Sequence, residues 1–579
     1  MNLNIISRVS RLAAIGAILL GSASCIDINE ELGENLIPTD QKWDVYTPEP
    51  INLKEIRMQM SDSLSGYSTS RFTFGAISDG VLGTSVKSTS FTLAPISDTL
   101  DFGRNTVVKQ FHFCAVKDTL STVYDNQRRM LQNVYVSELK KPLDSTVLYT
   151  GAFTDAAIRE EFLDLNNRIT VGIPVYDGGD SLSFDFSKEW TMKFIERLRT
   201  ADMDSMDFYI KSAPGIYITT DTPAGPGGRI NMFKLPIGTD SYGYITGNYA
   251  QLKFTAEYDY SDEPVDTSFL FYFGPADFLE EKAASYPTQF AFNASSHETS
   301  ETYSGEGVMA TDKIYVEGGA GIKPVISASE IKDILDSLMA ENGIVDQSEV
   351  VINKATIMLP FEASGEYTAL KKYPTILSPT VRLRSADGRY VSYAGLTDAS
   401  IESENQGDIN RSLMNYAPDI SHHVQEILRL DRNAEDFTKR IGNYDIWMLI
   451  MFSENATEES TTGYNEYKQN LLYNSYYNSM MYDPYGYGYG YGGYGGYGGY
   501  YGGYGGYGGY GGYGYGSNYY NYMMMAAYAS GYSGTDTGSY TVELDKDRFY
   551  SGVLNGPEAA GAKPQIKITF SAPKSAEAE

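Results

Sequence analysis

Short segments in which apolar and polar residues alternate recur along most of this chain. Successive side chains of a β-strand point to opposite faces, so a period of two is typical of a strand that is buried on one face. Turn residues rather than regular helices separate these segments, which favours antiparallel sheets over a parallel α/β sheet. We therefore expect a mainly β protein with two or more antiparallel β-sandwich domains and a few short helices. The pattern is carried by residues 108–114, 133–136, 215–219, 252–258, 268–273, 313–316, 350–359, 380–393, 446–452, 540–544 and 565–570.

Two segments carry a helical pattern instead. In residues 327–342, Ser327 followed by Glu330 fits a capping box, and Asn342–Gly343 favours a left-handed stop. A second helix is expected over residues 187–198. We interpret the apolar stripes of both helices as packing surfaces rather than ligand grooves. These stripes comprise Ile331, Ile334, Leu335, Leu338 and Met339 in the first helix, and Trp190, Phe194 and Leu198 in the second.

The amino terminus carries the pattern of a secretory signal. Arg8 and Arg11 precede an apolar run, Leu12–Leu20, which is much shorter than the ~20 residues that a membrane-spanning helix needs. The next residues, Ser22–Cys25, resemble the lipobox of bacterial lipoproteins in its relaxed Bacteroides-type form, where the cysteine becomes the acylated first residue. We expect residues 1–24 to be a lipoprotein signal peptide and Cys25 to be the lipidation site. The alternative is an ordinary secretory signal that happens to contain a cysteine.

Two further features bear on where the protein resides. The acids Asp27, Glu30 and Glu31 resemble the signal that sends such lipoproteins to the exterior face of the outer membrane. The periplasmic face is the alternative. Asp followed by Ser or Thr and then an aliphatic residue, Met or Thr resembles the general O-glycosylation site of these bacteria, although the same pairs are favoured in unmodified turns. The candidate O-glycosylation sites are Ser63, Thr99, Thr119, Ser145, Ser181, Ser205 and Ser337.

One segment breaks the strand pattern. Residues 485–516 contain only Tyr and Gly, 13 and 19 of them, and Tyr- and Met-rich flanks extend the segment. Ordering Gly costs the most backbone entropy, and no aliphatic residue is present to offset it, so we expect a disordered insertion over residues 472–538. Its aromatics would stack weakly on sugars or on one another; the alternative is a repeat expansion tolerated in a surface loop. Its glycines match G-x-G-x-x-G without a strand and helix around them, which argues against a dinucleotide site.

Charge and cysteine content exclude several classes of function. With 74 Asp+Glu against 45 Lys+Arg, the formal net charge of −29 gives an average field that repels nucleic acid and anionic lipid headgroups, and we expect no nucleic-acid partner. The two cysteines, Cys25 and Cys114, cannot form a disulfide framework, and Cys114 lies in an alternating run that predicts a buried strand residue. Four histidines leave few ligands for a zinc site, and we expect no metal or other cofactor.

No catalytic motif is recognisable in the sequence. There is no G-x-S-x-G elbow or phosphate loop, and His112 and His297 lack a recognisable serine context. Adjacent residues point in different directions, so we interpret His422 and His423 as surface or half-buried residues rather than a chelating pair. Glycosidases need only two suitably spaced carboxylates, which cannot be picked out among so many acids. Four acids are clustered in the sequence, and we interpret them as solvated turn residues, with Ca²⁺ binding as the alternative interpretation. They are Asp164, Asp177, Asp180 and Asp185.

Several short motifs follow one another in an order that points to a family. They are Leu32–Pro38, Gly215–Thr220, Gly318–Lys323, Ile352–Ala355, Asp419–Gln425, Val553–Pro557 and Lys563–Ile568. Together they resemble an uncharacterised lipoprotein family of Bacteroides-type bacteria, known only as a domain of unknown function. The resemblance implies an extracytoplasmic, lipid-anchored β-protein and carries over no activity and no functional residue. The final part is also similar to the jelly-roll sandwiches that accompany cell-surface and carbohydrate-active proteins.

These observations divide the chain into parts and lead to one main hypothesis. We expect a lipid-anchored, non-enzymatic envelope protein that binds or scaffolds, with the membrane as partner through Cys25 and with glycans or outer-membrane proteins as further partners. Two alternatives stay open: an accessory subunit of an outer-membrane assembly or export machine, and a glycan-active enzyme with a carboxylate pair. The expected parts are the signal peptide 1–24, a lipidated tether 25–48, an N-terminal β-rich domain 49–270, an intermediate β region 271–345 and a C-terminal jelly-roll-like domain 346–579.

Overall fold

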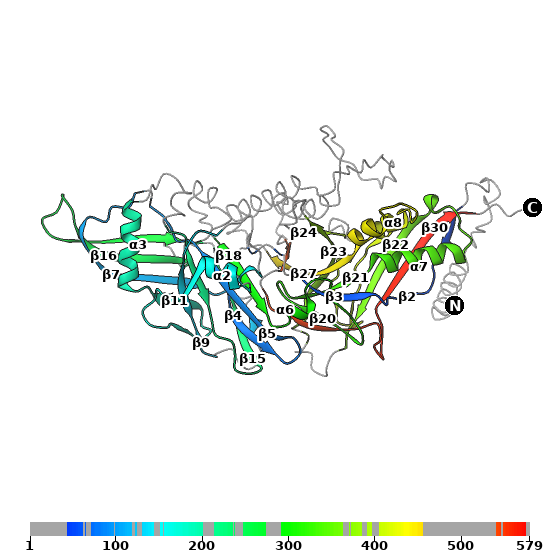
Figure 1. Ribbon diagram of the computed structural model, residues 1–579, viewed down its shortest axis with the longest axis horizontal. Coiled ribbons are helices and arrows are strands. Elements are labelled where there is room, and N and C mark those ends of the chain that lie inside the picture. Colours follow the sequence, from blue (N-terminus) through cyan, green and yellow to red (C-terminus); the bar gives the residue numbers. More distant parts are fainter. Residues whose placement is uncertain are drawn as a thin grey trace, which may run out of the picture.

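Two β-sandwiches are joined end to end in the computed structural model (Figure 1). The first sandwich, at the left in this view, is formed mainly by residues 71–297, and the second, at the right, by residues 43–60 and 308–574. The structure describes residues 43–574 apart from residues 62–63, 65, 67–70, 98, 119–121, 124–129, 144–150, 155, 201–212, 236, 238–246, 274–290, 363–369, 371, 385–390, 397–404, 456–539 and 546–547.

The first sandwich packs two antiparallel sheets face to face. Within the described ranges, one sheet has the order β11-β10-β14-β5-β4-β15-β8, with β18 added on β5, and the other has the order β13-β7-β16-β17-β6. Strands β9 and β12 form a separate pair. The bounds are β4 Arg71–Asp79, β5 Gly83–Phe91, β6 Ala94–Pro95, β7 Arg104–Val116, β8 Thr122–Val123, β9 Gln132–Asn133, β10 Tyr135–Leu139, β11 Leu163–Arg168, β12 Val175–Tyr176, β13 Ser181–Asp185, β14 Ile216–Thr219, β15 Gly227–Lys234, β16 Tyr249–Glu257, β17 Val265–Tyr272 and β18 Ala291–His297.

Strand β5 is a branch point of the larger sheet. Residues 85–87 pair with both β4 and β18, whereas residues 89–91 pair with both β14 and β18. Because a strand has two edges, β18 follows one edge throughout, and β4 and β14 share the other. This register places His297, the last residue of β18, directly opposite Ser85.

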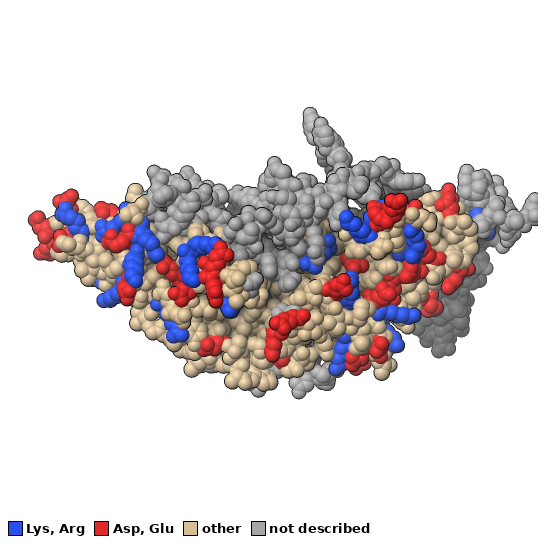
Figure 2. Space-filling model, in the orientation of Figure 1, with Lys and Arg blue, Asp and Glu red and all other residues tan. Residues whose placement is uncertain are grey.

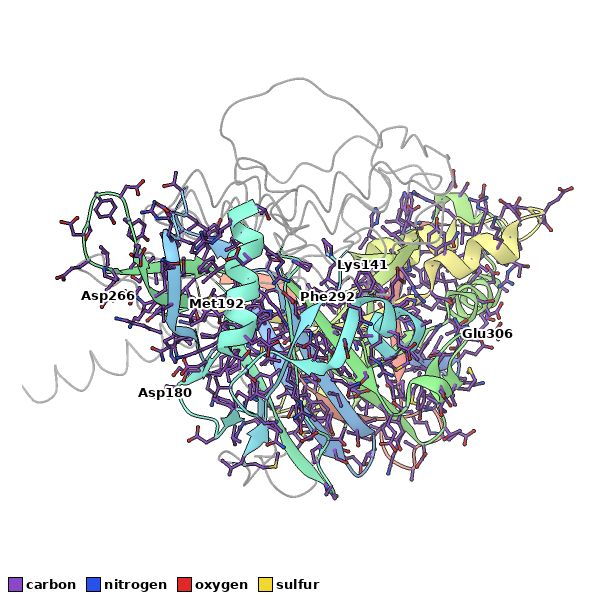
Figure 3. The ribbon with its side chains drawn as sticks, turned by 60° about the vertical axis from the view of Figure 1, so that its left-hand side comes forward. Lys141, Asp180, Met192, Asp266, Phe292 and Glu306 are labelled. Atoms are coloured by element: carbon purple, nitrogen blue, oxygen red, sulfur yellow. The ribbon has the colours of Figure 1, made fainter. Side chains whose placement is uncertain are left out.

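The core of the first sandwich is rich in aromatic residues. Phe111 and Phe113 of β7 contact a chain of stacked and tilted rings that includes Trp190 and Phe194 of the helix over this sheet. A smaller cluster on the outer face of the other sheet contains Phe292, which is fully buried. Figure 3 shows Phe292 in the interior, whereas Asp266 of β17 lies at the outer margin of this sandwich. Aromatic burial of this extent supplies a large part of the stabilising free energy.

The second sandwich also packs two antiparallel sheets. In the part of the chain that the structure describes, their orders are β19-β3-β21-β27-β23-β24, with β28 on β27, and β1-β30-β22-β26-β25, with β2 on β30. Strands β20 and β29 form a pair. The bounds are β1 Trp43–Tyr46, β2 Ile51–Asn52, β3 Ile56–Met60, β19 Val308–Met309, β20 Lys313–Glu317, β21 Ile322–Ile326, β22 Val351–Pro360, β23 Ile376–Arg384, β24 Val391–Gly395, β25 Ile409–Asn410, β26 Asn415–Tyr416, β27 Ile446–Asn455, β28 Tyr540–Leu544, β29 Ser551–Asn555 and β30 Gln565–Pro573.

Helices cover parts of both sandwiches, and the two expected ones are confirmed. The helix expected over residues 327–342 is α7, whose apolar stripe packs into the second core, and the helix expected over residues 187–198 is α3, which buries Trp190, Phe194 and Leu198. The described helices are α2 Ala156–Phe162, α3 Lys188–Thr200, α6 Ser300–Tyr303, α7 Ala328–Glu341, α8 Ser421–Leu428 and α9 Phe437–Ile441, with 3-10 turns η3 Ala152–Thr154, η5 Gln347–Glu349 and η7 Gly442–Tyr444.

The capping box expected at the start of α7 is only half correct. The Ser327 side chain accepts a hydrogen bond from the Glu330 backbone amide at 3.3 Å, as expected, and Gly343 ends the helix with a φ of 69°. The Glu330 carboxylate, however, accepts from the backbone amides of Lys54 at 2.6 Å and Glu55 at 2.8 Å. It therefore joins α7 to the segment between β2 and β3 instead of closing its own helix turn.

The alternating segments are confirmed as strands. Among the strands outside those segments, β4, β15 and β18 are buried along almost their whole length, so their sequences do not alternate, whereas β13 and β29 do alternate between buried and more exposed residues. The expected boundaries also differ from the sheets. Residues 43–60 were expected to belong to the tether and the N-terminal domain, but they pair with β19, β21 and β30 of the second sandwich. Strand β18 lies beyond the expected domain boundary at residue 270, but it pairs with β5 and belongs to the first sandwich.

Close strand contact at Gly228 generates a prediction. This residue has a φ of 119°, and a Cβ there would lie 2.1 Å from the Ala76 carbonyl oxygen of β4. We expect Gly228→Ala to lower the free energy of unfolding by at least about 2 kcal/mol, because the paired backbones must separate. Gly225→Ala in the preceding loop is the matched control, since a Cβ there meets no atom within 4 Å. Urea denaturation of both variants checks this, and equal stability would contradict it.

Candidate functional site

The residues expected to be modified are only partly described by the structure. Cys25 and the candidate glycosylation sites Ser63, Thr119, Ser145 and Ser205 lie outside the described residues, as does the Tyr/Gly-rich segment 472–538. The other three candidate sites are described, and all are exposed. Thr99 lies in the loop between β6 and β7, and Ser181 begins β13. Ser337 lies within α7, where its hydroxyl donates to the Asp333 carbonyl at 2.8 Å, so it is not in a turn.

The histidine pair differs from its interpretation as surface or half-buried residues. His422 is exposed, but His423, on another face of α8, is fully buried, and its Nε2 donates to the Tyr444 carbonyl at 2.8 Å. Burial lowers the pKa of His423 to about 4, so the ring is neutral at neutral pH. Helix geometry turns adjacent residues in different directions and explains the separation. Cys114 is a half-buried residue of β7, and burial raises the pKa of its thiol.

The four clustered acids do not converge on one point in the described part of the chain. Asp185 contacts His112 Nδ1 at 2.7 Å and accepts from Gln110 at 3.0 Å, whereas Asp177 accepts from the Gly179 amide at 2.9 Å. Among the described residues there is no group of three or more His, Cys, Asp or Glu side chains suited to hold a metal ion. On the face seen in Figure 2, Lys and Arg side chains lie among Asp and Glu side chains.

The two sandwiches meet at the tip of the β4–β5 hairpin. Leu82, at this tip, is 2% exposed and belongs to the core of the second sandwich rather than the first. Ile77 of β4 packs with Phe549, which precedes β29. Ser551 of β29 donates to Asp79 at 3.2 Å. The hairpin therefore joins the sandwiches through both apolar and polar contacts.

A buried polar cluster lies behind this hairpin and forms the most unusual site of the structure. His297 of β18 and Ser85 of β5 come from the first sandwich, whereas Glu317, the last residue of β20, comes from the second. His297 Nδ1 lies 2.6 Å from Glu317 Oε1 and 3.2 Å from Ser85 Oγ, and Ser85 also donates to Glu317. Ser295 Oγ lies 2.9 Å from the other ring nitrogen, Nε2. Both ring nitrogens of His297 are thus engaged at the boundary between the sandwiches.

A buried lysine completes the cluster on the side of the second sandwich. Lys323 of β21 donates to the carbonyls of Glu317 at 2.6 Å, Gly319 at 2.9 Å and Gly321 at 3.0 Å. Three acceptors match the three protons of an ammonium group. Burial lowers the pKa of Lys323 to about 7, although the nearby Glu317 carboxylate favours the charged form. The lysine therefore holds the 317–321 turn that carries Glu317.

The charge of Glu317 is stabilised by its neighbours. Burial alone disfavours the carboxylate, but His297, Ser85 and Lys323 outweigh this effect, so the pKa of Glu317 lies below its ordinary value. Its second oxygen, Oε2, has no hydrogen-bond partner among the described residues. Losing the contact with His297 would leave a largely uncompensated buried charge, which is strongly destabilising.

The order Ser295–His297–Glu317 matches the roles of a serine, a base and an orienting acid. Catalysis by such a group requires that the serine reach a substrate. Ser295 is 4% exposed, His297 6% and Glu317 0%. In this structure the group therefore acts as a buried link between the two sandwiches. Ser295 lies two residues from His297 on the same strand face, so this part of the serine context can be read from the spacing once β18 is known to be a strand. Ser85 is 212 residues from His297, and no local pattern in the sequence connects the two.

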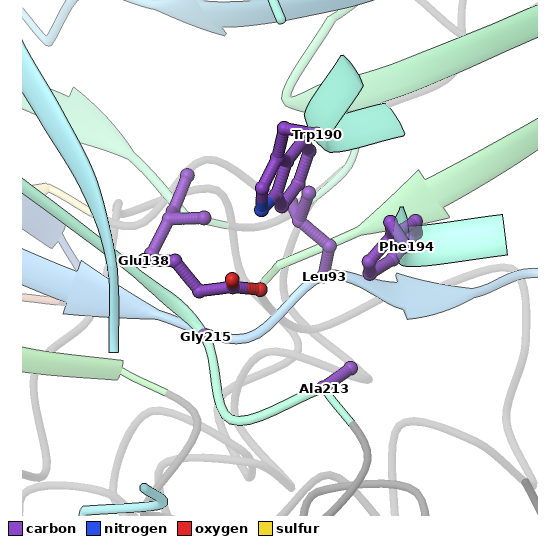
Figure 4. Close-up of a pocket in the computed structure, with 7 residues that line it drawn as sticks. Leu93, Glu138, Trp190, Phe194, Ala213 and Gly215 are labelled. Carbon is purple, nitrogen blue, oxygen red and sulfur yellow. The ribbon is translucent and has the colours of Figure 1, made fainter. Parts of the chain in front are cut away.

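A small crevice lies where α3 meets β10 and β14 in the first sandwich (Figure 4). Its free space, including the open mouth, is about 210 Å³. Glu138 pairs with Arg197, and the indole N–H of Trp190 has no hydrogen-bond partner among the described residues. Its walls are residues of the first core and its margin, so it is a gap in the packing. The lining residues are Leu93, Glu138, Trp190, Phe194, Ala213, Gly215 and Ile216.

Comparison with known proteins does not assign this chain to a family. No protein-family model, no curated protein and no solved structure matches it. Among the described residues, none of the helices has both the length and the apolar character that crossing a membrane requires.

The buried cluster predicts a large effect of replacing His297. His297→Ala leaves the Glu317 carboxylate buried without its imidazole partner, and we expect the free energy of unfolding to fall by about 3–5 kcal/mol. His112→Ala is the matched control, because the His112–Asp185 contact is partly exposed and such pairs contribute about 1 kcal/mol or less. Urea denaturation measures both effects. Similar losses for the two variants would contradict the structural role of His297.

The lowered pKa of Glu317 predicts a specific pH dependence. The unfolded chain binds a proton on this residue at a higher pH than the folded protein does, so its stabilising contribution is present above the ordinary Glu pKa and is lost as the pH falls through the folded value. Glu317→Gln removes this titration. We expect the melting temperature of the variant to lie below that of the wild type at neutral pH, with the difference shrinking on acidification. A difference that stays constant between about pH 7 and pH 3 would contradict this.

Proposed function

We propose that the protein is a lipid-anchored protein of the cell envelope that acts by binding or scaffolding rather than by catalysis. The observation that carries the proposal is the position of β1, a strand that follows Cys25 closely in the sequence. Strand β1 pairs along Trp43–Tyr46 with β30, at the end of the second sandwich that lies away from the first (Figure 1). An anchor on Cys25 would hold this end near the membrane and present the first sandwich outward.

The length of the intervening chain supports this arrangement. Cys25 and Trp43 are 18 positions apart (43 − 25), so the chain between them reaches at most about 65 Å at up to ~3.6 Å per residue. Several acyl chains give persistent membrane attachment, because each buried CH₂ contributes ~0.8 kcal/mol. The anchor therefore limits how far β1 can move from the bilayer surface.

The buried junction supports a scaffolding role. Leu82 inserts into the second core, and His297 contacts Glu317 across the boundary. Both contacts would be broken, and a charge left unpaired, if the sandwiches moved apart. The two sandwiches therefore act as one rigid body that sets a fixed distance between the anchored end and the outer end. Outer-membrane proteins or glycans are the partners we expect at the outer end.

The anchor is tested by Cys25→Ala. We expect this variant to move from the membrane fraction to the soluble fraction, because the mature chain then carries no lipid. Cys114→Ala removes the other thiol of the chain and should leave the protein in the membrane fraction. Cell fractionation followed by mass spectrometry of the mature amino terminus measures both points. A wild-type chain with an unmodified Cys25 would overturn the anchor.

The scaffolding role is tested on the same membrane-bound protein. Cross-linking in intact cells and affinity capture after detergent solubilisation should recover an outer-membrane protein or a glycan in fixed ratio to the wild-type chain. Turnover of a polysaccharide that is abolished by replacing one described Asp or Glu would instead favour the carboxylate-pair enzyme and would overturn the non-enzymatic proposal.

A further inference from the structure

Exposed apolar side chains gather on one face at the anchored end of the molecule. In the sheet β1-β30-β22, the register aligns Val45 with Ser571 and Ser571 with Val351, and it aligns Trp43 with Pro573. Aligned residues point to the same side of a sheet. On this side Trp43 is 48% exposed, Val45 65% and Val351 46%. Tyr46 and Phe570 point to the other side, toward the core, where their ring centroids stack 5.0 Å apart. We call this side the outer face of β1-β30-β22.

The charge of this outer face differs from that of the whole chain. The register continues with Lys354 opposite Thr569 and Thr356 opposite Lys567, so both lysines belong to the outer face. Both are exposed, and Lys354 Nζ lies 3.9 Å from Asp419. None of the outward-pointing positions in the described pairs of these three strands is an acid; the nearest acid of the register is the buried Asp419, which lies opposite Thr356 at the edge of β22. In a chain with a net charge of −29, this face therefore combines apolar and basic side chains.

We propose that the outer face of β1-β30-β22 lies against the surface of a lipid bilayer that contains anionic headgroups. This inference rests on the proposed lipid anchor and adds the orientation of the protein on its membrane. Tryptophan is enriched at membrane–water interfaces, and each lysine near an anionic surface contributes favourable free energy. The exposed valines beside Trp43 extend the apolar contact area.

The position of the face in the chain identifies the bilayer as its partner. Trp43 lies only 18 positions after Cys25 (43 − 25), so a lipid on Cys25 keeps this face, rather than the first sandwich, within reach of the membrane. Tethering raises the effective concentration of the face at the bilayer, so a weak contact is sufficient. The contact fixes the orientation, while the acyl chains provide most of the attachment.

The test uses the mature chain without its lipid, from residue 26 onward, which retains every described residue. Vesicles of equal parts phosphatidylglycerol and phosphatidylethanolamine are compared with vesicles of phosphatidylcholine alone. Trp190 and Trp447 are 6% and 4% exposed, so a blue shift of tryptophan emission on adding vesicles reports mainly on Trp43. We expect this shift with the anionic vesicles only, and quenching by brominated acyl chains.

Variants separate the outer face from the rest of the surface. The double variant Val45→Asp with Lys567→Glu should bind the anionic vesicles at least about tenfold more weakly, because it inserts acids into the contact. Val107→Asp with Lys109→Glu is the matched control on β7 of the first sandwich, where Val107 is 62% exposed. We expect this control to bind as the wild type does. Thermal melting of all three proteins verifies that each is folded.

Three outcomes would overturn the proposal. One is an unshifted emission spectrum of the wild-type chain with anionic vesicles. Another is equal binding by the two double variants. The third is a concentration-dependent dimer, seen by sedimentation, that is lost in the Val45→Asp variant, since this would assign the face to a second copy. These results are independent of the anchor: a vesicle contact can be present with Cys25 unmodified, and an acylated Cys25 can be present without it.

Discussion

The buried contact between His297 and Glu317 links the two sandwiches, together with the contacts at the tip of the β4–β5 hairpin. Glu317 is fully buried, and a carboxylate in such a place requires partners that favour its charge. Those partners come from both sandwiches: His297 and Ser85 from one side, and Lys323 from the other. Each sandwich therefore completes the polar shell of a group that the other cannot stabilise alone. The outward presentation that we propose for the first sandwich would depend on this shared shell.

The fold was largely predictable from the sequence, because most strands have one exposed face. Alternation located β7, β16, β22 and β30 within a few residues. Strands such as β4 and β15 are covered on both faces, and their side chains carry no periodic signal. Strand β1 falls in the expected tether, and β2 and β3 fall in the expected N-terminal domain, although all three pair with strands of the second sandwich. Pairing across more than 200 residues leaves no local trace in the sequence. The side chain of Glu330 was misassigned for the same reason: its partners lie 275 and 276 residues away.

The candidate site was much less predictable. Ser295 and His297 share one face of β18, which is readable from their spacing, but neither Ser85 nor Glu317 can be connected to them without the register of β5 and β18. The motif Gly318–Lys323 was recognised only as a family landmark. The structure gives it a physical reason: a Cβ on Gly321 would lie 2.5 Å from Glu317 Oε2, and Lys323 binds the carbonyls of the same turn. Glycine and lysine there serve the buried carboxylate.

Strands β27 and β28 pair directly at Asn455 and Tyr540, so the chain leaves and re-enters one sheet at adjacent positions. The separation of these two points is set by the sheet and not by the residues between them. The entropic cost of closing a loop grows only with the logarithm of its length. The number of residues between Asn455 and Tyr540 can therefore change during evolution with little effect on the stability of the fold. The same two positions are a suitable insertion site for a reporter domain whose own termini lie close together.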